Sequence, residues 1–399
     1  MCIVTVNRRA PWIWTLAIVL FAVFEAVGFQ LRGPLLTSIQ RTFSTSTELL
    51  GLVATAGTVG FVASVLSVGF LAGRLDVRRA LLVGGALVGV SVLAIGVAPS
   101  FLVLLGALFV RGVATGPFRA LDRAVLGHLY PDSRARVYNL YALVWAIGAS
   151  AGPLVAAAAI RLGDWRYAYL GLGLAFLPAI VLFATLDLPD SVDAERPLSL
   201  ADVRAVLRRP AVAGMSVSLV LSGGVEGSLF TWLPYFATTH VGIADGSLFL
   251  FAYLVAYIPA RLTYSHLVGR MQPSTLVAGI ALAAAPLVVA LTVVEGRLAL
   301  FVTAFLLGGC VSGVFPTLSA IGVDAAPEYS GPVNATATAS SYVGIATVPA
   351  AVGVLTAAFG ITRGLLLLPA LLVVLVVIVG VTRLRMRQGS VVPAAIAGR

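Results

Sequence analysis

Twelve long apolar runs, separated by short stretches of glycine, proline and charged residues, make up most of this sequence. A helix that crosses a bilayer needs about 20 mostly apolar residues, and each run is about that long. Only 11% of the residues are charged, against about 25% in an ordinary soluble domain. The sequence therefore predicts an all-α membrane protein whose twelve transmembrane helices lie at about 12–36, 47–71, 80–98, 101–127, 137–160, 166–186, 211–238, 246–268, 275–294, 298–322, 333–357 and 364–384.

All 26 basic residues are arginines, and the formal net charge is +10. Without lysine the chain can form neither a phosphate-binding loop ending in Gly-Lys nor a Schiff base, which excludes ATP-driven transport by this chain alone. The arginines lie between apolar runs rather than in one basic patch, which argues against nucleic-acid binding. Two cysteines and three scattered histidines predict neither a disulfide framework nor a metal site, and we expect no cofactor.

Arginines are more frequent in the loops on one side of the predicted membrane than on the other. Because cytoplasmic loops carry the excess of positive charge, this bias predicts that both termini lie in the cytoplasm. Arg8 and Arg9 precede the first apolar run and imitate a signal peptide, but eleven further runs favour a retained anchor. We therefore expect a multi-pass protein of the cell (plasma) membrane.

The longest polar segment, residues 187–210, divides the chain into two sets of six spans that resemble each other. Glu25 matches Glu226, residues 71–74 match 267–270, Asn139 matches Asn334 and Arg166 matches Arg363, at spacings of 195 to 201 residues. We expect an N-terminal six-helix bundle at 1–186, a cytoplasmic linker at 187–210, a C-terminal six-helix bundle at 211–384 and a cytoplasmic tail at 385–399. Duplicated halves predict a substrate site at the interface between the repeats.

The linker contains one pattern that is typical of a helix. Ser199-x-x-Asp202 resembles a capping box, and the apolar residues that follow are spaced along one helical stripe. This pattern predicts a short amphipathic helix on the cytoplasmic surface, and a disordered loop is the alternative.

The loop after the second span carries the first family resemblance. Residues 69–79 read Gly-Phe-Leu-Ala-Gly-Arg-Leu-Asp-Val-Arg-Arg and resemble the Gly-x-Leu-Ala-Asp-Arg-x-Gly-Arg-Arg signature of the major facilitator superfamily of secondary transporters. The sequence departs from the signature at Gly73, where the family has aspartate, and Asp76 comes three residues later. The resemblance extends over essentially the whole chain and implies two pseudo-symmetric six-helix bundles that rock around a midplane site, and no enzymatic activity.

Four further motifs fit this family. Asp164-Trp165-Arg166 opens the sixth span, and Arg111 in the fourth span is followed by Gly112 and Gly116. Gly148-x-x-x-Gly152-Pro153 resembles a motif frequent in antiporters of the family, although small residues four apart also bring helices close together in any membrane bundle. Residues 226–235 resemble, over about ten residues, the fucose and hexose symporter branch.

Three ionisable residues within the spans are candidates for proton coupling: Glu25, Arg111 and Glu226. A charge near the bilayer centre costs about 3 kcal/mol, so each needs a partner, a bound proton or contact with water. The depths of Glu25 and Arg111 allow a pair that protonation of Glu25 or competing substrate would release. The alternatives are a permanent ion pair that joins two helices and, for Glu226, a protonated side chain bonded to a helix carbonyl.

A larger set of polar and aromatic residues could bind the substrate. Tyr253, Tyr257, Arg261 and Tyr264 lie along one helical stripe, where hydroxyl-bearing rings can contact a sugar or an organic cation. Ordinary helix packing, snorkelling and the interfacial aromatic belt are the competing explanations. The full predicted set is Gln30, Arg32, Asn139, Trp145, Trp232, Tyr235, Tyr253, Tyr257, Arg261, Asn334 and Tyr342.

Charged residues at the predicted cytoplasmic ends of the spans are candidates for gating. A cluster of opposite charges there can hold the two halves together in one access state, although a solvated face that sets orientation is the simpler alternative. The predicted gating residues are Arg74, Asp76, Arg78, Arg119, Asp122, Arg123 and Arg270.

These observations predict a secondary active transporter that moves a small organic solute by alternating access, coupled to protons, with symport of a sugar-like solute as the main interpretation. A proton-driven multidrug or metabolite efflux antiporter and an uncoupled facilitator are the alternatives. A membrane sensor would need a longer soluble loop, and an intramembrane enzyme would need better placed histidines. We expect the partners to be the solute, protons and the lipid bilayer, and the protein to be a monomer.

Overall fold

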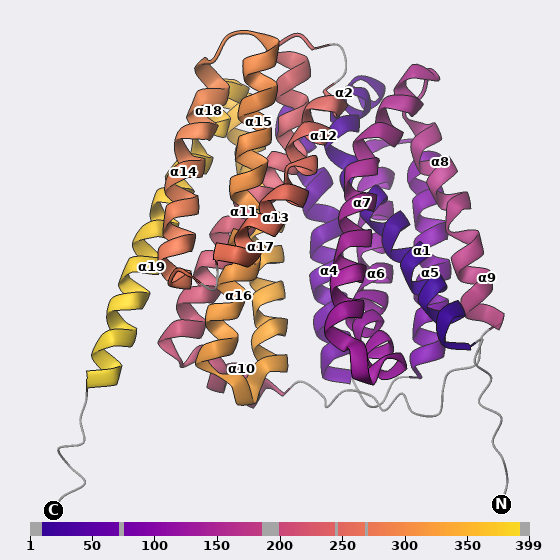
Figure 1. Cartoon of the computed structure of the whole chain (residues 1–399). Coiled ribbons are helices and arrows are strands. Elements are labelled where there is room, and N and C mark those ends of the chain that lie inside the picture. The colour runs from indigo at the N-terminus through magenta and orange to yellow at the C-terminus, as the bar shows by residue number, and fades with distance from the viewer. Residues whose placement is uncertain (1–9, 72–75, 186–198, 244–245, 268–269, 392–399) are drawn as a thin grey trace, which may run out of the picture. The chain divides into compact units, whose positions relative to one another are not determined.

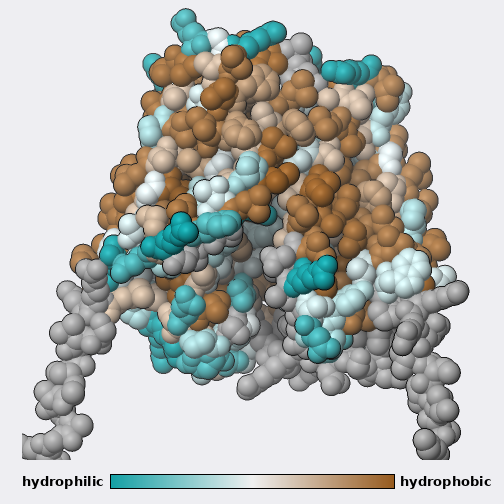
Figure 2. All heavy atoms as spheres, viewed as in Figure 1, coloured by the Kyte–Doolittle hydropathy of each residue, from teal (hydrophilic) through white to brown (hydrophobic). Residues whose placement is uncertain are grey.

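The computed structural model describes residues 10–71, 76–185, 199–243, 246–267 and 270–391, and helices occupy almost all of them. Within these ranges, twelve helical segments are long and apolar enough to cross a membrane, as the twelve apolar runs predict. The ends differ from the predicted ones by a few residues. Figure 2 shows apolar side chains over much of each half of the chain, and polar side chains at the top, at the bottom and in a band across the lower middle of the left half.

The chain divides into two compact units. Unit 1 comprises Met1–Thr45 and Ala56–Pro197. Its elements run from indigo to magenta in Figure 1: α1 (Ala10–Gln30), α2 (Arg32–Phe43), most of α4 (Leu52–Leu71), α5 (Val77–Gly96), α6 (Phe101–Leu129), the 3-10 turn η1 (Pro131–Ser133), α7 (Arg134–Arg161), α8 (Arg166–Ala175) and α9 (Leu177–Thr185).

Unit 2 comprises Ser46–Thr55 and Leu198–Arg399. Its elements are α3 (Thr47–Leu50), the first turn of α4, α10 (Leu200–Leu207), α11 (Pro210–Thr239), α12 (Ser247–Val255), α13 (Tyr257–Leu267), α14 (Pro273–Val293), α15 (Arg297–Val311), α16 (Val314–Ala325), η2 (Pro327–Tyr329), α17 (Ser330–Phe359), α18 (Ile361–Leu365) and α19 (Leu367–Val391). The short segment 46–55 groups with unit 2 because α3 packs on α17 and the Thr55 hydroxyl donates to the Ala346 carbonyl at 2.6 Å.

Five of the spans are each divided into two helices; a proline explains four of these breaks, and the fifth, between α3 and α4, falls at Gly51. In these four spans the helix is interrupted two to four residues before the proline, which lies at 178, 259, 316 or 369. Proline has no N–H to donate, and its ring collides with the carbonyl four residues earlier, so the helix kinks there. Pro117 and Pro234 by contrast lie inside continuous helices.

Glycines at matching positions of the two units bring helix backbones into contact. A Cβ atom at Gly112 of α6 would overlap the carbonyl oxygen of Gly57 in α4, and 196 residues later one at Gly308 of α15 would overlap that of Tyr253 in α12. Gly148 and Gly344, also 196 residues apart, face carbonyls of α1 and α11 in the same way. The duplication seen in the sequence is therefore repeated in helix packing.

Part of the linker is helical. Helix α10 begins after Ser199, whose hydroxyl accepts the backbone N–H of Asp202 at 3.0 Å and donates to the Asp202 carboxylate at 2.6 Å. This side chain satisfies one of the N–H groups that have no partner within the helix. Val206 on the same helix is fully buried, and α10 packs against α11 and α17. Linker residues 187–198 lie outside the described part of the chain.

Candidate functional site

Glu25 of α1 and Arg111 of α6 meet inside unit 1. The Arg111 guanidinium lies 3.9 Å from a Glu25 carboxylate oxygen, and the same nitrogen donates to the Glu25 backbone carbonyl at 3.1 Å. Both side chains are more than nine-tenths buried. The Glu25 carboxylate thus faces the Arg111 cation at a distance longer than a direct hydrogen bond. The hydrogen bond that Arg111 does donate goes to the Glu25 backbone carbonyl, which is neutral at every pH.

Small residues on neighbouring helices make this arrangement possible. Gly28 lies one helical turn after Glu25, and a Cβ atom there would come within 2.8 Å of the Arg111 guanidinium. Gly148 and Gly152 bring α7 against α1, and the Trp145 indole N–H of α7 then donates to the other Glu25 carboxylate oxygen at 3.2 Å. The site is therefore built by α1, α6 and α7 together.

Two more predicted residues lie on the next turns of the chain and are also buried. Arg32 is 5% exposed; its Nε donates to the Phe29 carbonyl at 3.1 Å, and its guanidinium lies 4.1 Å from the centre of the Phe29 ring. Gln30 is 1% exposed, and neither polar atom of its amide has a partner among the described residues. An amide buried in this way favours a bound water or ligand group.

A second polar cluster joins α6 and α7 within unit 1. Asp122 is fully buried, accepts a hydrogen bond from the Tyr141 hydroxyl, and lies 3.3 Å from Arg119. Arg119 also donates to the Tyr141 oxygen at 2.6 Å. The two predicted gating residues are thus brought together around Tyr141. This tyrosine lies one turn before Trp145, on the same face of α7.

In unit 2, Glu226 of α11 lies against the tyrosine stripe. The Tyr257 hydroxyl donates to the Glu226 carboxylate at 2.6 Å, and the Tyr253 hydroxyl lies 3.1 Å from that of Tyr257. The Arg261 side chain is exposed, and its guanidinium lies 5.5 Å from the centre of the Tyr257 ring. Three predicted binding residues therefore form one group with the predicted carboxylate.

The other predicted residues of unit 2 lie apart from this group. Trp232 is fully buried and donates its indole N–H to the Pro349 carbonyl of α17 at 2.9 Å, while Tyr235 packs edge-on against it. Asn334 is exposed, and Tyr342 is half-buried. The contacts of Trp232 join two helices, a structural role that its sequence alone does not reveal.

The remaining predicted gating residues occupy helix ends. Asp76 accepts the backbone N–H of Arg79 at 3.0 Å, so it caps the start of α5, and Arg78 donates to the Ala184 carbonyl at 3.0 Å. Arg270 is exposed. Arg74 lies outside the described residues, as do the side chains of Arg123 and Asn139.

Comparison with known proteins yields one family and several relatives. The family model described as Major Facilitator Superfamily matches residues 18–252. The chain is 26% identical over 219 residues to "Multidrug resistance protein Stp" of two Mycobacterium tuberculosis strains, CDC 1551 / Oshkosh and ATCC 25618 / H37Rv; the match covers 50% of this chain and 40% of that protein. The chain therefore spans less than half the length of these curated relatives.

Solved structures give the same fold. The crystal structure of a bacterial homologue of the human lysosomal transporter Spinster, inward-facing and unoccupied, aligns with a TM-score of 0.82 and 14% identity, covering 96% of this chain and 98% of that one. The nucleoside transporter NupG aligns with a TM-score of 0.79 and 10% identity, covering 93% and 99%. The predicted all-helical fold with twelve spans is confirmed. These relatives are not fucose or hexose symporters, so the resemblance of residues 226–235 to that branch gains no support.

Proposed function

Because the chain belongs to the Major Facilitator Superfamily, and is thus a multi-pass secondary transporter of small molecules rather than an enzyme, we propose that it exports organic compounds in exchange for protons. The similarity to a multidrug resistance protein supports export of largely apolar, drug-like compounds over import of a sugar. Because that similarity covers only half of this chain, the drug-like substrate class is proposed here together with the direction of transport.

The single observation that carries the proposal is the buried carboxylate of Glu25. It lies within a membrane span, 3.9 Å from Arg111, with the Trp145 N–H on its second oxygen. A carboxylate buried within a span needs a cation, a bound proton or water beside it, and Glu25 has the cation Arg111. Such residues are typical of proton pathways in transporters.

The proposed exchange follows from these contacts. A proton on Glu25 removes its Coulomb attraction to Arg111, while the Glu25 backbone carbonyl still accepts from the guanidinium. When the proton leaves, the ion pair forms again. If substrate binds with different affinity to these two states, substrate and proton bind alternately, and the difference in affinity sets the strength of coupling.

Glu226 supplies a second polar contact in this proposal. The Glu226 carboxylate accepts from the Tyr257 hydroxyl, which lies beside the Tyr253 hydroxyl. Together with the Arg261 guanidinium, these groups offer hydrogen-bond donors and acceptors beside aromatic rings. Such a group can hold a polar or cationic part of an otherwise apolar compound. We further propose that the protein acts as a monomer in the plasma membrane with both termini in the cytoplasm, as the distribution of arginines predicts.

Proteoliposomes with an acidic lumen test the proposal. Ethidium added outside should accumulate in the lumen as protons leave, and a proton ionophore should abolish the accumulation. Glu25→Gln should abolish it as well, whereas Glu295→Gln, the same substitution at an exposed loop residue, should not. Accumulation that requires an alkaline lumen would indicate symport, and equilibration without accumulation in all three proteins would indicate an uncoupled facilitator; either result overturns the proposed exchange.

A further inference from the structure

Unit 2 contains a pocket of about 420 Å³ that lies apart from Glu226 and the tyrosines. Four helices, α11, α14, α16 and α19, form a ring in which each packs against two others. The pocket lies inside this ring at the end where α11 and α14 begin and α16 and α19 approach their ends. Its volume is in the range of sites that bind small organic molecules, about 300–1,000 Å³.

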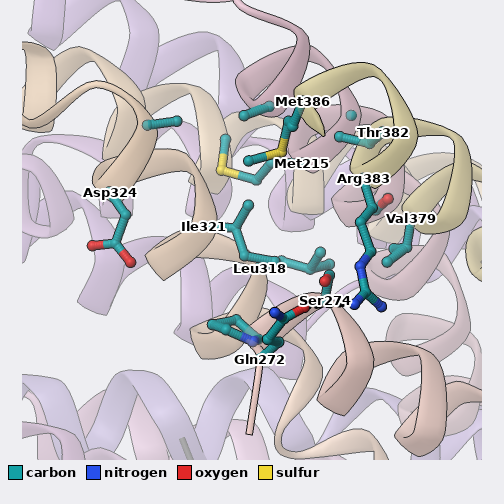
Figure 3. Close-up of a pocket in the computed structure, with 15 residues that line it drawn as sticks. Met215, Gln272, Ser274, Leu318, Ile321, Asp324, Val379, Thr382, Arg383 and Met386 are labelled. Carbon is teal, nitrogen blue, oxygen red and sulfur yellow. Dashed lines mark hydrogen bonds between the residues drawn. The ribbon is translucent and has the colours of Figure 1, made fainter. Parts of the chain in front are cut away.

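Most of the lining is apolar and adaptable. Side chains from three helices project into the pocket: Met215, Leu318, Ile321, Val379 and Met386. Figure 3 shows the two methionines near each other, with Leu318 and Ile321 between Asp324 and Arg383. Unbranched, polarisable methionine side chains adjust to ligands of different shape. This surface suits a flexible hydrocarbon segment.

One cation is fixed at the edge of the pocket. The Arg383 guanidinium of α19 donates to the Thr275 hydroxyl at 3.0 Å and to the Gln272 side-chain oxygen at 2.6 Å, both at the start of α14. Arginine has five N–H donors, and the described residues accept from two of its three nitrogens. The guanidinium is therefore held in place with donors left for a ligand, and an anion is the strongest acceptor for them.

A buried hydroxyl supplies a second indication of a ligand. Ser218 of α11 lines the pocket and is fully buried, yet its oxygen has no hydrogen-bond partner among the described residues. A buried polar atom without a partner is costly unless something else in the pocket pairs with it. The pocket thus combines an apolar surface, a fixed cation and an unsatisfied hydroxyl.

We propose that this pocket binds an amphiphilic anion with a hydrocarbon chain of medium length, its anionic group on Arg383 and its chain against the methionines. Asp324 lies on the opposite side of the pocket and is exposed, so it repels the anion and favours this orientation of the ligand. The site is separate from Glu25 and Glu226, and the proposal goes beyond the proposed export and does not depend on it.

Calorimetry on the purified full chain in nanodiscs of zwitterionic lipid tests the charge. Dodecanoate should bind, and dodecanol should bind at least about tenfold more weakly because it lacks the charge that pairs with the guanidinium. Arg383→Gln should weaken dodecanoate binding by about tenfold, whereas Arg385→Gln, an exposed arginine two residues further on, should change it less than about twofold. Asp324→Asn should leave the affinity for dodecanoate unchanged or raise it.

Photo-crosslinking locates the ligand without relying on a variant. Dodecanoate with a diazirine at the chain end should label peptides of α11, α16 and α19 in the wild-type chain, and unlabelled dodecanoate should compete. Adding an anionic phospholipid to the nanodiscs identifies the source: competition points to the bilayer, and its absence points to an amphiphile from the aqueous phase. Equal dodecanoate affinity in the wild type and Arg383→Gln, weaker binding by Asp324→Asn, or labelling confined to other helices would overturn the proposal.

Discussion

The contact between Glu25 and Arg111 leads to the most detailed prediction. Glu25→Gln leaves a buried guanidinium without its counter-ion, and Arg111→Gln leaves a buried carboxylate without its cation. Removing one partner of a buried pair costs about 3–5 kcal/mol, because the remaining charge has neither solvent nor partner. The double variant contains neither charge, so its loss of unfolding free energy should be smaller than the sum of the losses in the two single variants.

The distance sets the expected size of this difference. Two unit charges about 4 Å apart attract by about 4 kcal/mol at an effective dielectric constant of about 20, and Glu25 and Arg111 are 3.9 Å apart. Arg111 keeps its bond to the Glu25 carbonyl when the carboxylate changes, which retains part of the interaction. We therefore expect a coupling energy of about 2–4 kcal/mol from the double-mutant cycle.

The assay is denaturant unfolding at neutral pH in one mild detergent, followed by tryptophan fluorescence for the wild type and the three variants. The exposed pair Asp76 and Arg79, with a separation of 3.3 Å, is the matched control, and its cycle should give less than about 1 kcal/mol. A coupling energy for the buried pair no larger than that of this control would refute the reasoning.

Three further predictions concern packing and an exposed ion pair. Gly112→Ala should lower the melting temperature markedly, since overpacking costs about 1–3 kcal/mol or more, whereas Gly106→Ala on the same helix, with open space around it, should not destabilise the protein. Trp232→Phe should cost about 1 kcal/mol through the lost hydrogen bond and leave the apparent affinity for substrate in transport assays unchanged. Hydrogen bonds from its own backbone N–H and then from Arg209 lower the pKa of the Glu328 carboxylate. The carboxylate therefore stabilises the folded protein at pH values above its pKa in the unfolded chain, and this stabilisation is lost as the pH falls through its lower pKa in the folded protein. Glu328→Gln should therefore flatten the acid limb of stability against pH, and an unchanged limb would contradict this.

The spans were predictable because the signal for each is local. Length and hydropathy alone locate the twelve helices, since a lipid environment permits few other structures. The ends and interruptions of these helices were harder to predict from the sequence. Pro259 breaks its span whereas Pro234 does not, so the presence of a proline alone does not predict a break.

The polar groups were predictable only in part. Depth along the chain indicated that Glu25 and Arg111 could meet, and the tyrosine spacing indicated one helix face, but no local pattern indicated that Glu226 lies on that face. The pocket with Arg383 combines residues from four helices that are spread over positions 211 to 386, so nothing in the sequence marked it. Single-sequence patterns report positions along one helix and not which helices adjoin.

Proton release on ligand binding tests the central claim most directly. Purified protein in weakly buffered solution, at a pH where the wild type transports, is mixed with ethidium while a pH indicator is monitored. If substrate and proton exchange at Glu25, the wild type should release protons in proportion to the ethidium bound, and Glu25→Gln should bind ethidium and release none. Equal proton release by Glu25→Gln and the wild type would contradict the account.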